Sequence, residues 1–202
     1  MTIEKGAPWG RPGSLPDQGV VVGSDAEASE VLATARRKGR ALPPLGLVGG
    51  DLCRTLGGPG DERRLRSPQA VTFEVDLGEA LVDGRLHLFV AHLVLRDRLW
   101  TRAFVAMNAQ WRGRWNLGPR AHPGDGLLDT YDVRLPVRAL PAVRSRLHHG
   151  AHLPHPGIRE RRAPAVQVEL EKPLSLEVDG RAAGRGRVVA VRVEPDAVTV
   201  VV

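Results

Sequence analysis

The chain has 202 residues, of which 42% are hydrophobic, so it can bury the core of one large or two small domains. Its only cysteine, Cys53, excludes an internal disulfide and a cysteine-based zinc site. The formal net charge is +6, but the basic residues are almost all arginines, and no basic block other than "WRGRW" alternates with aromatic residues, so nucleic acid is disfavoured as a partner.

The first part of the chain predicts alternating strands and helices. Residues 1–18 are rich in proline and glycine, and we expect an irregular arm there. The apolar strand "GVVVG" leads into a helix whose start fits a capping box made by Ser24 and Glu27, and Gly39 is suited to end it. A second apolar strand, "LGLV", and a short helix, "DLCRTLGG", follow. Strands that are apolar on both faces are typical of a parallel sheet, so residues 19–67 predict a small α/β domain.

The periodicity changes after the linker "GPGDERRLRSPQ". "VTFEVDL" alternates apolar and polar residues, and "VQVEL", "LSLEV", "VVAVRVE" and "AVTVVV" repeat that pattern near the end of the chain. Asp83-Gly84 and Asp179-Gly180 are typical of hairpin turns. Residues 68–202 therefore predict an antiparallel β-sandwich, and the fold class is α+β.

Several segments occur in an order that is recognisable. They are "VVVGSDAEASEVL", "LGLVGGDLCRTLGG", "VDLG", "GPRAHPGDGLLDTYDVRL" and "LSLEVDGRAAG". Together they resemble the bacterial diacylglycerol and lipid kinase family, which is related to sphingosine kinases and NAD kinases. The resemblance covers residues 20–202 and implies an NAD kinase-like α/β nucleotide domain followed by a β-sandwich. The family's first strand and helix have no match, so the resemblance implies an N-terminally truncated α/β domain.

The resemblance also implies nucleotide-binding positions, in degenerate form. Two of the glycines and the threonine of the first phosphate loop are replaced by Ser24, Ala26 and Glu27, and the threonine and asparagine of the second by Val48 and Gly50. The residues alone favour an ordinary capped helix over a working phosphate loop, and the aspartates can equally be helix-start residues. The candidate positions are Gly23, Asp25, Glu27, Gly49 and Asp51.

Catalytic and metal positions follow from the same resemblance. Asp97 is matched to a third acidic position, and Asp125, flanked by His122 and Leu127, to a metal-associated aspartate, although Asp125 can equally be a turn residue. Arg181 stands where the family has its catalytic glutamate. An arginine side chain stays protonated and cannot act as a base. A zinc site in the histidine-rich segment 148–155 is disfavoured.

The sequence thus predicts a pseudoenzyme: a degenerate diacylglycerol kinase-like protein without kinase activity that serves as a lipid-binding or regulatory module. Its ligand would be a lipid or a lipid phosphate, with no cofactor. The alternative is an active lipid kinase that uses ATP and Mg²⁺, and a third reading is a basic binder of membrane surfaces or nucleic acid. Because no secretory signal or membrane-spanning apolar run is found, we expect a cytoplasmic protein, in part peripheral at a membrane. A truncated sheet also predicts a homodimer or a covering partner chain.

Overall fold

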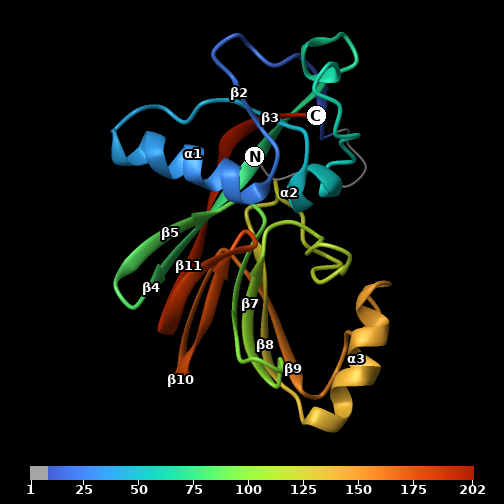
Figure 1. The fold of residues 1–202 in the computed structure, drawn as a ribbon, viewed down its shortest axis with the longest axis vertical. Helices are drawn as coiled ribbons and strands as arrows, with labels where there is room; N and C mark the ends of the chain where they lie inside the picture. The colour runs from blue at the N-terminus through green and yellow to red at the C-terminus, as the bar shows by residue number, and fades with distance from the viewer. Residues whose placement is uncertain (1–8) are drawn as a thin grey trace.

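The computed structural model describes residues 9–202 and begins with an α/β unit. Two short parallel strands lie beside each other, each followed by a helix, at the top of Figure 1. Leu32 of the first helix is fully buried in a cluster with apolar residues of both strands. The elements are β2 (Val20–Val22), α1 (Asp25–Arg37), β3 (Leu45–Leu47) and α2 (Gly50–Thr55).

Antiparallel strands make up most of the remaining chain, as the alternating sequence pattern predicts. The main path of the sheet has the order β1-β4-β11-β10-β6-β7-β8-β9, and β5 pairs with β4. Phe89, Phe104 and other large apolar side chains fill the interior between the folded-over halves of the sheet. The strands are β1 (Arg11–Pro12), β4 (Val71–Val82), β5 (Arg85–Phe89), β6 (His92–Arg96), β7 (Arg102–Met107), β8 (Leu128–Arg134), β9 (Ile158–Ala163), β10 (Ala165–Val178) and β11 (Arg181–Val201).

Local signals in the sequence are confirmed where they depend on neighbouring residues. Ser24 is the N-cap of α1, and Gly39 beyond its end has a φ of +62°. Asp83 and Asp179 have φ values of +47° and +48° and are each followed by a glycine of positive φ in a two-residue hairpin turn. Three short helices lie outside the predicted elements: η1 (Arg64–Arg66), η2 (Val137–Ala139) and α3 (Leu140–Leu147).

The last strand joins the two parts of the molecule. β11 pairs antiparallel with β4 along most of its length, and at its end Val200 pairs with Leu45 of β3 in parallel. β2 and β3 therefore extend the same sheet that forms the sandwich (Figure 1). The change in sequence pattern near residue 68 does not coincide with a break in the sheet.

The chain itself covers one face of the β2–β3 sheet, which we had expected to be exposed. Leu15 and Leu65 are 3% and 1% exposed and pack with Val21 and Val48. Leu15 belongs to the predicted irregular arm, which also contributes β1 to the edge of β4, so the arm is more ordered than expected; residues 1–8 lie outside the described part. Within residues 9–202, β2 pairs only with β3, and its outer edge stays open to a further strand.

Candidate functional site

The N-terminus of α1 is closed by its own side chains. The Ser24 hydroxyl accepts a hydrogen bond from the Glu27 N–H (3.2 Å), and the Glu27 carboxylate accepts one from the Gly23 N–H (2.8 Å). The Ser24 half of the predicted capping box is confirmed, but the Glu27 carboxylate accepts from the Gly23 N–H and not from the Ser24 N–H that a capping box would use. The backbone N–H of Gly23 is thereby directed at a carboxylate of the same chain.

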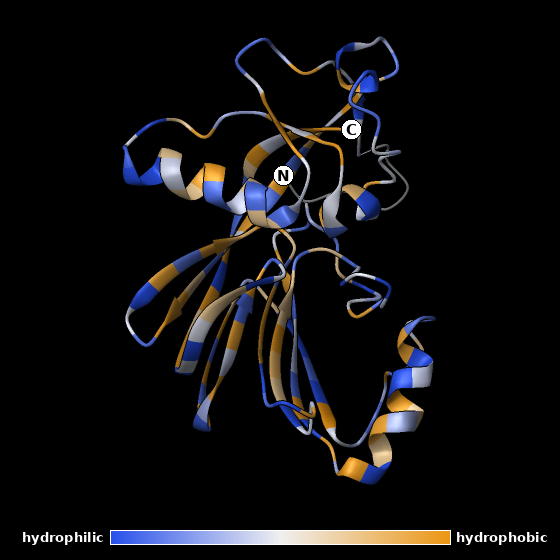
Figure 2. Ribbon diagram, in the orientation of Figure 1, coloured by the Kyte–Doolittle hydropathy of each residue, from blue (hydrophilic) through white to orange (hydrophobic). Residues whose placement is uncertain are grey.

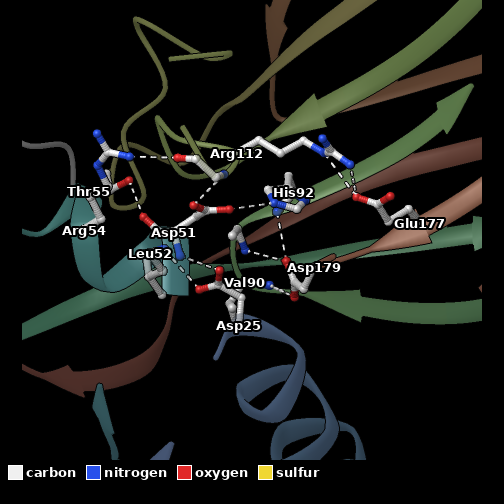
Figure 3. Close-up of polar contacts among 12 residues, drawn as sticks. Asp25, Asp51, Leu52, Arg54, Thr55, Val90, His92, Arg112, Glu177 and Asp179 are labelled. Carbon is white, nitrogen blue, oxygen red and sulfur yellow. Dashed lines mark hydrogen bonds and ion pairs between the residues drawn. The ribbon is translucent and has the colours of Figure 1, made fainter. Parts of the chain in front are cut away.

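The N-terminus of α2 is closed by Asp25 of α1. The two oxygens of Asp25 accept from the N–H groups of Asp51 (2.5 Å) and Leu52 (3.0 Å), as Figure 3 shows. The N-cap residue of α2, Gly49, has no side chain that could do this. Gly50 has a φ of +95°, and a Cβ there would lie 2.5 Å from an Asp25 oxygen, so this contact requires glycine.

Asp51 links α2 to the sandwich. One oxygen contacts the His92 Nε2 of β6 at 3.1 Å, and the other accepts from the Gly113 N–H at 2.8 Å. Burial alone would raise the pKa of Asp51, but the hydrogen bonds from His92 and Gly113 outweigh it and lower this pKa. His92 is buried, which works against its charged form, yet Asp51 and Asp179 together raise its pKa.

Asp179, in the β10–β11 turn, is the third aspartate near His92. Its carboxylate accepts hydrogen bonds from the N–H groups of Val90, Ala91 and His92, each at 2.9 Å. Burial raises the pKa of Asp179, although His92 and these N–H groups oppose the shift. Burial, and then the charge of Asp179, raises the pKa of Asp25 to about 6. The site therefore gathers three carboxylates and one imidazole (Figure 3).

The loop that contains "WRGRW" lies over this group. The Arg54 guanidinium of α2 stacks on the Trp111 ring at 3.6 Å and donates to the Gly113 carbonyl at 2.7 Å. Arg112 is ion-paired with Glu177 of β10. These contacts fix the loop that supplies the Gly113 N–H to Asp51, so the basic and aromatic residues here have a structural role.

Arg181 points away from the acidic group toward α1. Its guanidinium donates to Glu30 at 2.9 Å, and Arg37 donates to the same carboxylate at 3.0 Å. These two guanidiniums hold the pKa of the exposed Glu30 below its usual value. A groove of about 490 Å³ opens beside them, and its apolar lining includes Leu88 and Val178.

Two other sets of predicted residues lie elsewhere. Asp97 is in the β6–β7 turn, beyond the end of β6 opposite His92, and its carboxylate accepts from the Thr101 N–H at 2.9 Å. Although the resemblance matches Asp97 to a third acidic position, its carboxylate lies apart from Asp25 and Asp51 and closes a hairpin turn.

The residues of the predicted metal position also have partners within the chain. Asp125 accepts from the Leu127 N–H at 2.9 Å and is ion-paired with Arg162. The His122 ring packs on Trp9 at 4.3 Å. No set of three or more His, Cys, Asp or Glu residues within 9–202 is arranged to hold a metal ion. The structure thus supports the turn reading of Asp125.

A comparison with models of protein families identifies the family of the chain. Residues 69–202 match the model of the YegS C-terminal NAD kinase beta sandwich-like domain. The chain belongs to this family. The match confirms the resemblance to the diacylglycerol and lipid kinase family over the C-terminal domain. No curated protein matches the chain.

Solved structures share the fold of this YegS-type chain. A provisionally named diacylglycerol kinase from Bacillus anthracis str. Sterne has 15% identity and a TM-score of 0.67, with 91% of this chain and 76% of that chain covered. A diacylglycerol kinase structure from the same strain has 16% identity and a TM-score of 0.63, with 91% and 75% covered. At this identity the likeness concerns the fold.

None of the helices described in residues 9–202 is long and apolar enough to cross a membrane.

Sequence reasoning missed two members of the site. Asp179 was recognised only as a turn residue, and its role as acceptor for three backbone N–H groups depends on contact with a strand pair distant in the sequence. His92 lies in the apolar run "LFVAHLVL", where a single histidine gives no signal of its own. Three-dimensional contacts reveal both residues.

Proposed function

We propose that this chain is a lipid-kinase-like protein that does not transfer phosphate and instead binds an anionic lipid. The observation that carries the proposal is that side chains of the chain occupy both helix N-termini at the predicted phosphate loops. At α1 the Ser24 hydroxyl is the cap and the Glu27 carboxylate holds the preceding Gly23 N–H, and at α2 the Asp25 carboxylate is the cap. A helix N-terminus binds phosphate through free N–H groups. With a carboxylate already there, a phosphate would meet both a filled site and a like charge.

The residues also fit Mg²⁺ and a general base poorly. Asp125 is neutralised by Arg162, and Arg181 occupies the position of the family glutamate while donating to Glu30. General-base help is worth about 10²–10⁴-fold in rate, and arginine cannot supply it. Accordingly, we assign no reaction step to ATP or Mg²⁺ in this chain.

The groove beside α1 supports the binding part of the proposal. Apolar side chains line it, and Arg37 and Arg181 share the single carboxylate of Glu30 at its rim. Two guanidiniums and one carboxylate leave one positive charge in excess. Such a combination suits an amphiphile with an anionic head group, such as a phosphorylated lipid.

Nucleotide binding is tested first, by thermal unfolding with and without Mg²⁺-ATP. A ligand at about 100 times its Kd adds about 2.7 kcal/mol to the stability of the folded state. We expect no rise in Tm for the wild type, and a rise for Ala26→Gly/Glu27→Thr, which frees the α1 N-terminus. A clear rise in the wild type would contradict the proposal.

Lipid binding is tested with a soluble short-chain phosphatidic acid and the matching diacylglycerol. We expect only the phosphate-bearing lipid to bind, and Arg181→Ala to weaken it about tenfold or more, since a hydrogen bond to a charged group is worth about 1.5–3 kcal/mol. The exposed Arg40, which lies outside the groove, provides the control Arg40→Ala. Equal binding of both lipids, or an equal loss in both variants, would contradict the groove assignment.

The alternative is an active lipid kinase, and the retained acidic group favours it. Asp25, with a pKa near 6, lies where a carboxylate could exchange protons near neutral pH. ATP-dependent phosphorylation of diacylglycerol by the purified wild type, lost in Asp125→Ala, would establish this alternative. We expect no transfer, and Arg181→Glu alone to restore none, because both helix ends stay capped.

A further inference from the structure

The outer surface of α3 is the starting point. α3 follows η2 and lies far from α1 and α2, at the lower end of the molecule in Figure 1. Leu140, Val143 and Leu147 are buried against the sheet, while Arg144 and Arg146 face solvent. Figure 2 shows this alternation of apolar and polar residues along the helix. α3 is therefore a short amphipathic helix that lies on the sandwich.

Two large apolar side chains are exposed beside the helix. Val137 of η2 is 62% exposed and Leu99 of the β6–β7 turn is 50% exposed. Arg144 donates to the Leu99 carbonyl at 3.5 Å, so the turn and the helix are in contact. Leu99 and Val137 are therefore exposed apolar side chains on the two elements that adjoin α3.

Basic residues predominate around these two side chains, and Asp97 is the acidic residue in the same turn as Leu99. Residues 133–159 include five arginines and four histidines but no aspartate or glutamate. Within residues 9–202, no ion pair is formed by Arg98, Arg138, Arg144 or Arg146, all of which are exposed. We name these four arginines together with Leu99 and Val137 the α3 surface. It combines unneutralised cations with apolar side chains.

The cavity beneath α3 does not offer an alternative site for a lipid chain. It is apolar, has a volume of about 50 Å³ and is lined by residues that include Leu140, Val143 and Leu147. A cavity of about 150 Å³ holds benzene, and a lipid chain is larger than benzene. A lipid can therefore meet this part of the protein only from outside.

We propose that the α3 surface docks on an anionic lipid membrane. Leu99 and Val137 enter the boundary between head groups and acyl chains, and the four arginines lie among the anionic head groups. The apolar face of α3 is packed on the sandwich, so the helix contributes its basic outer face, which attracts anionic head groups electrostatically. Each arginine near an anionic surface contributes about fivefold in binding. The proposal does not rest on the groove beside α1, because the membrane itself is the partner.

Flotation of the full chain with vesicles tests the proposal, using phosphatidylcholine alone and phosphatidylcholine mixed with phosphatidylglycerol. We expect binding only to the mixed vesicles, weakening as salt rises. Arg138→Gln/Arg146→Gln should lower the partition coefficient about 30-fold, and Val137→Ser about fivefold. All three substituted side chains are exposed, so each variant should keep the Tm of the wild type.

Matched controls lie on other elements. Arg40→Gln/Arg85→Gln removes two exposed arginines, and Leu81→Ser removes a leucine that is 48% exposed; neither should change binding. The proposal is overturned if the mixed vesicles bind no better than phosphatidylcholine, or if the control pair weakens binding as much as the α3 pair. It is also overturned if duplex DNA binds more tightly than the vesicles and depends on Arg138 and Arg146.

Discussion

The buried acidic group should make folding stability fall as the pH rises. The pKa of Asp25 increases from 3.8 to about 6 on folding, chiefly because the carboxyl is buried and then because Asp179 is close. The folded state therefore holds this proton more tightly than the unfolded state. The resulting stabilisation is complete below the unfolded pKa and is lost as the pH rises through 6. The pKa of His92 is also raised, so its contribution has the same sign.

The magnitude follows from the shift at Asp25. About two pKa units correspond to about 3 kcal/mol in total. Of this, about 1.4 kcal/mol is lost between pH 5 and pH 7.5, because at pH 5 the folded carboxyl is mostly protonated while the unfolded one is mostly charged. Asp51, whose pKa is lowered, acts in the opposite direction at lower pH. The Asp25 contribution must therefore be isolated by substitution.

Asp25→Asn keeps the shape of the side chain and removes its titration. We expect the stability lost in this variant, measured by urea unfolding with tryptophan fluorescence, to be about 1.4 kcal/mol larger at pH 5 than at pH 7.5. Asp17→Asn, at a fully exposed position, should show no such difference. If the loss in Asp25→Asn is the same at both pH values, Asp25 does not bind a proton in the folded state near pH 6.

Three further predictions concern stability and are checked by urea unfolding at pH 7.5. Glu27→Ala should cost about 1 kcal/mol by removing the acceptor of the Gly23 N–H, while Glu27→Gln should stay near wild type, and equal losses would contradict this role. Gly50→Ala should cost about 2 kcal/mol more than Gly39→Ala, because both have positive φ but only the Cβ at Gly50 meets a neighbour within 4 Å. Leu32→Ala, at a fully buried position, should cost about 2–5 kcal/mol, and a loss below 1 kcal/mol would show that α1 packs loosely.

Features of the fold that depend on short-range chemistry could be predicted from the sequence. The Ser24 hydroxyl caps a helix by accepting from the Glu27 N–H, which is only three residues away in the sequence. An Asp-Gly pair likewise suits the positive φ values of a hairpin turn, whatever residues surround it. Period-two alternation likewise indicated antiparallel strands. The pairing of β11 with β3 carries no such local mark, because its residues are apolar in any arrangement that buries them.

In the candidate site, too, contacts between residues distant in the sequence could not be predicted. Asp25 and Asp51, which the resemblance places in two neighbouring loops, lie close together, but the resemblance gives no reason to expect Asp25 to cap the helix that carries Asp51. Asp97 was matched to an acidic position of the family, and its Thr101 partner four residues later marks a hairpin turn instead. Which carboxylate meets which N–H group depends on the placement of whole elements, which local patterns do not specify.

The shared strand β11 also has a consequence for the order in which the protein folds during synthesis. Leu45 leaves the ribosome well before its parallel partner Val200, because the whole sandwich lies between them in the sequence. Until then, β2 and β3 form a two-stranded parallel sheet with one edge open, and such pairs have little stability of their own. Contacts between residues far apart in the sequence form slowly. The α/β unit, although made before the sandwich, is therefore completed after it, and its helix ends acquire their final partners only once the sandwich has formed.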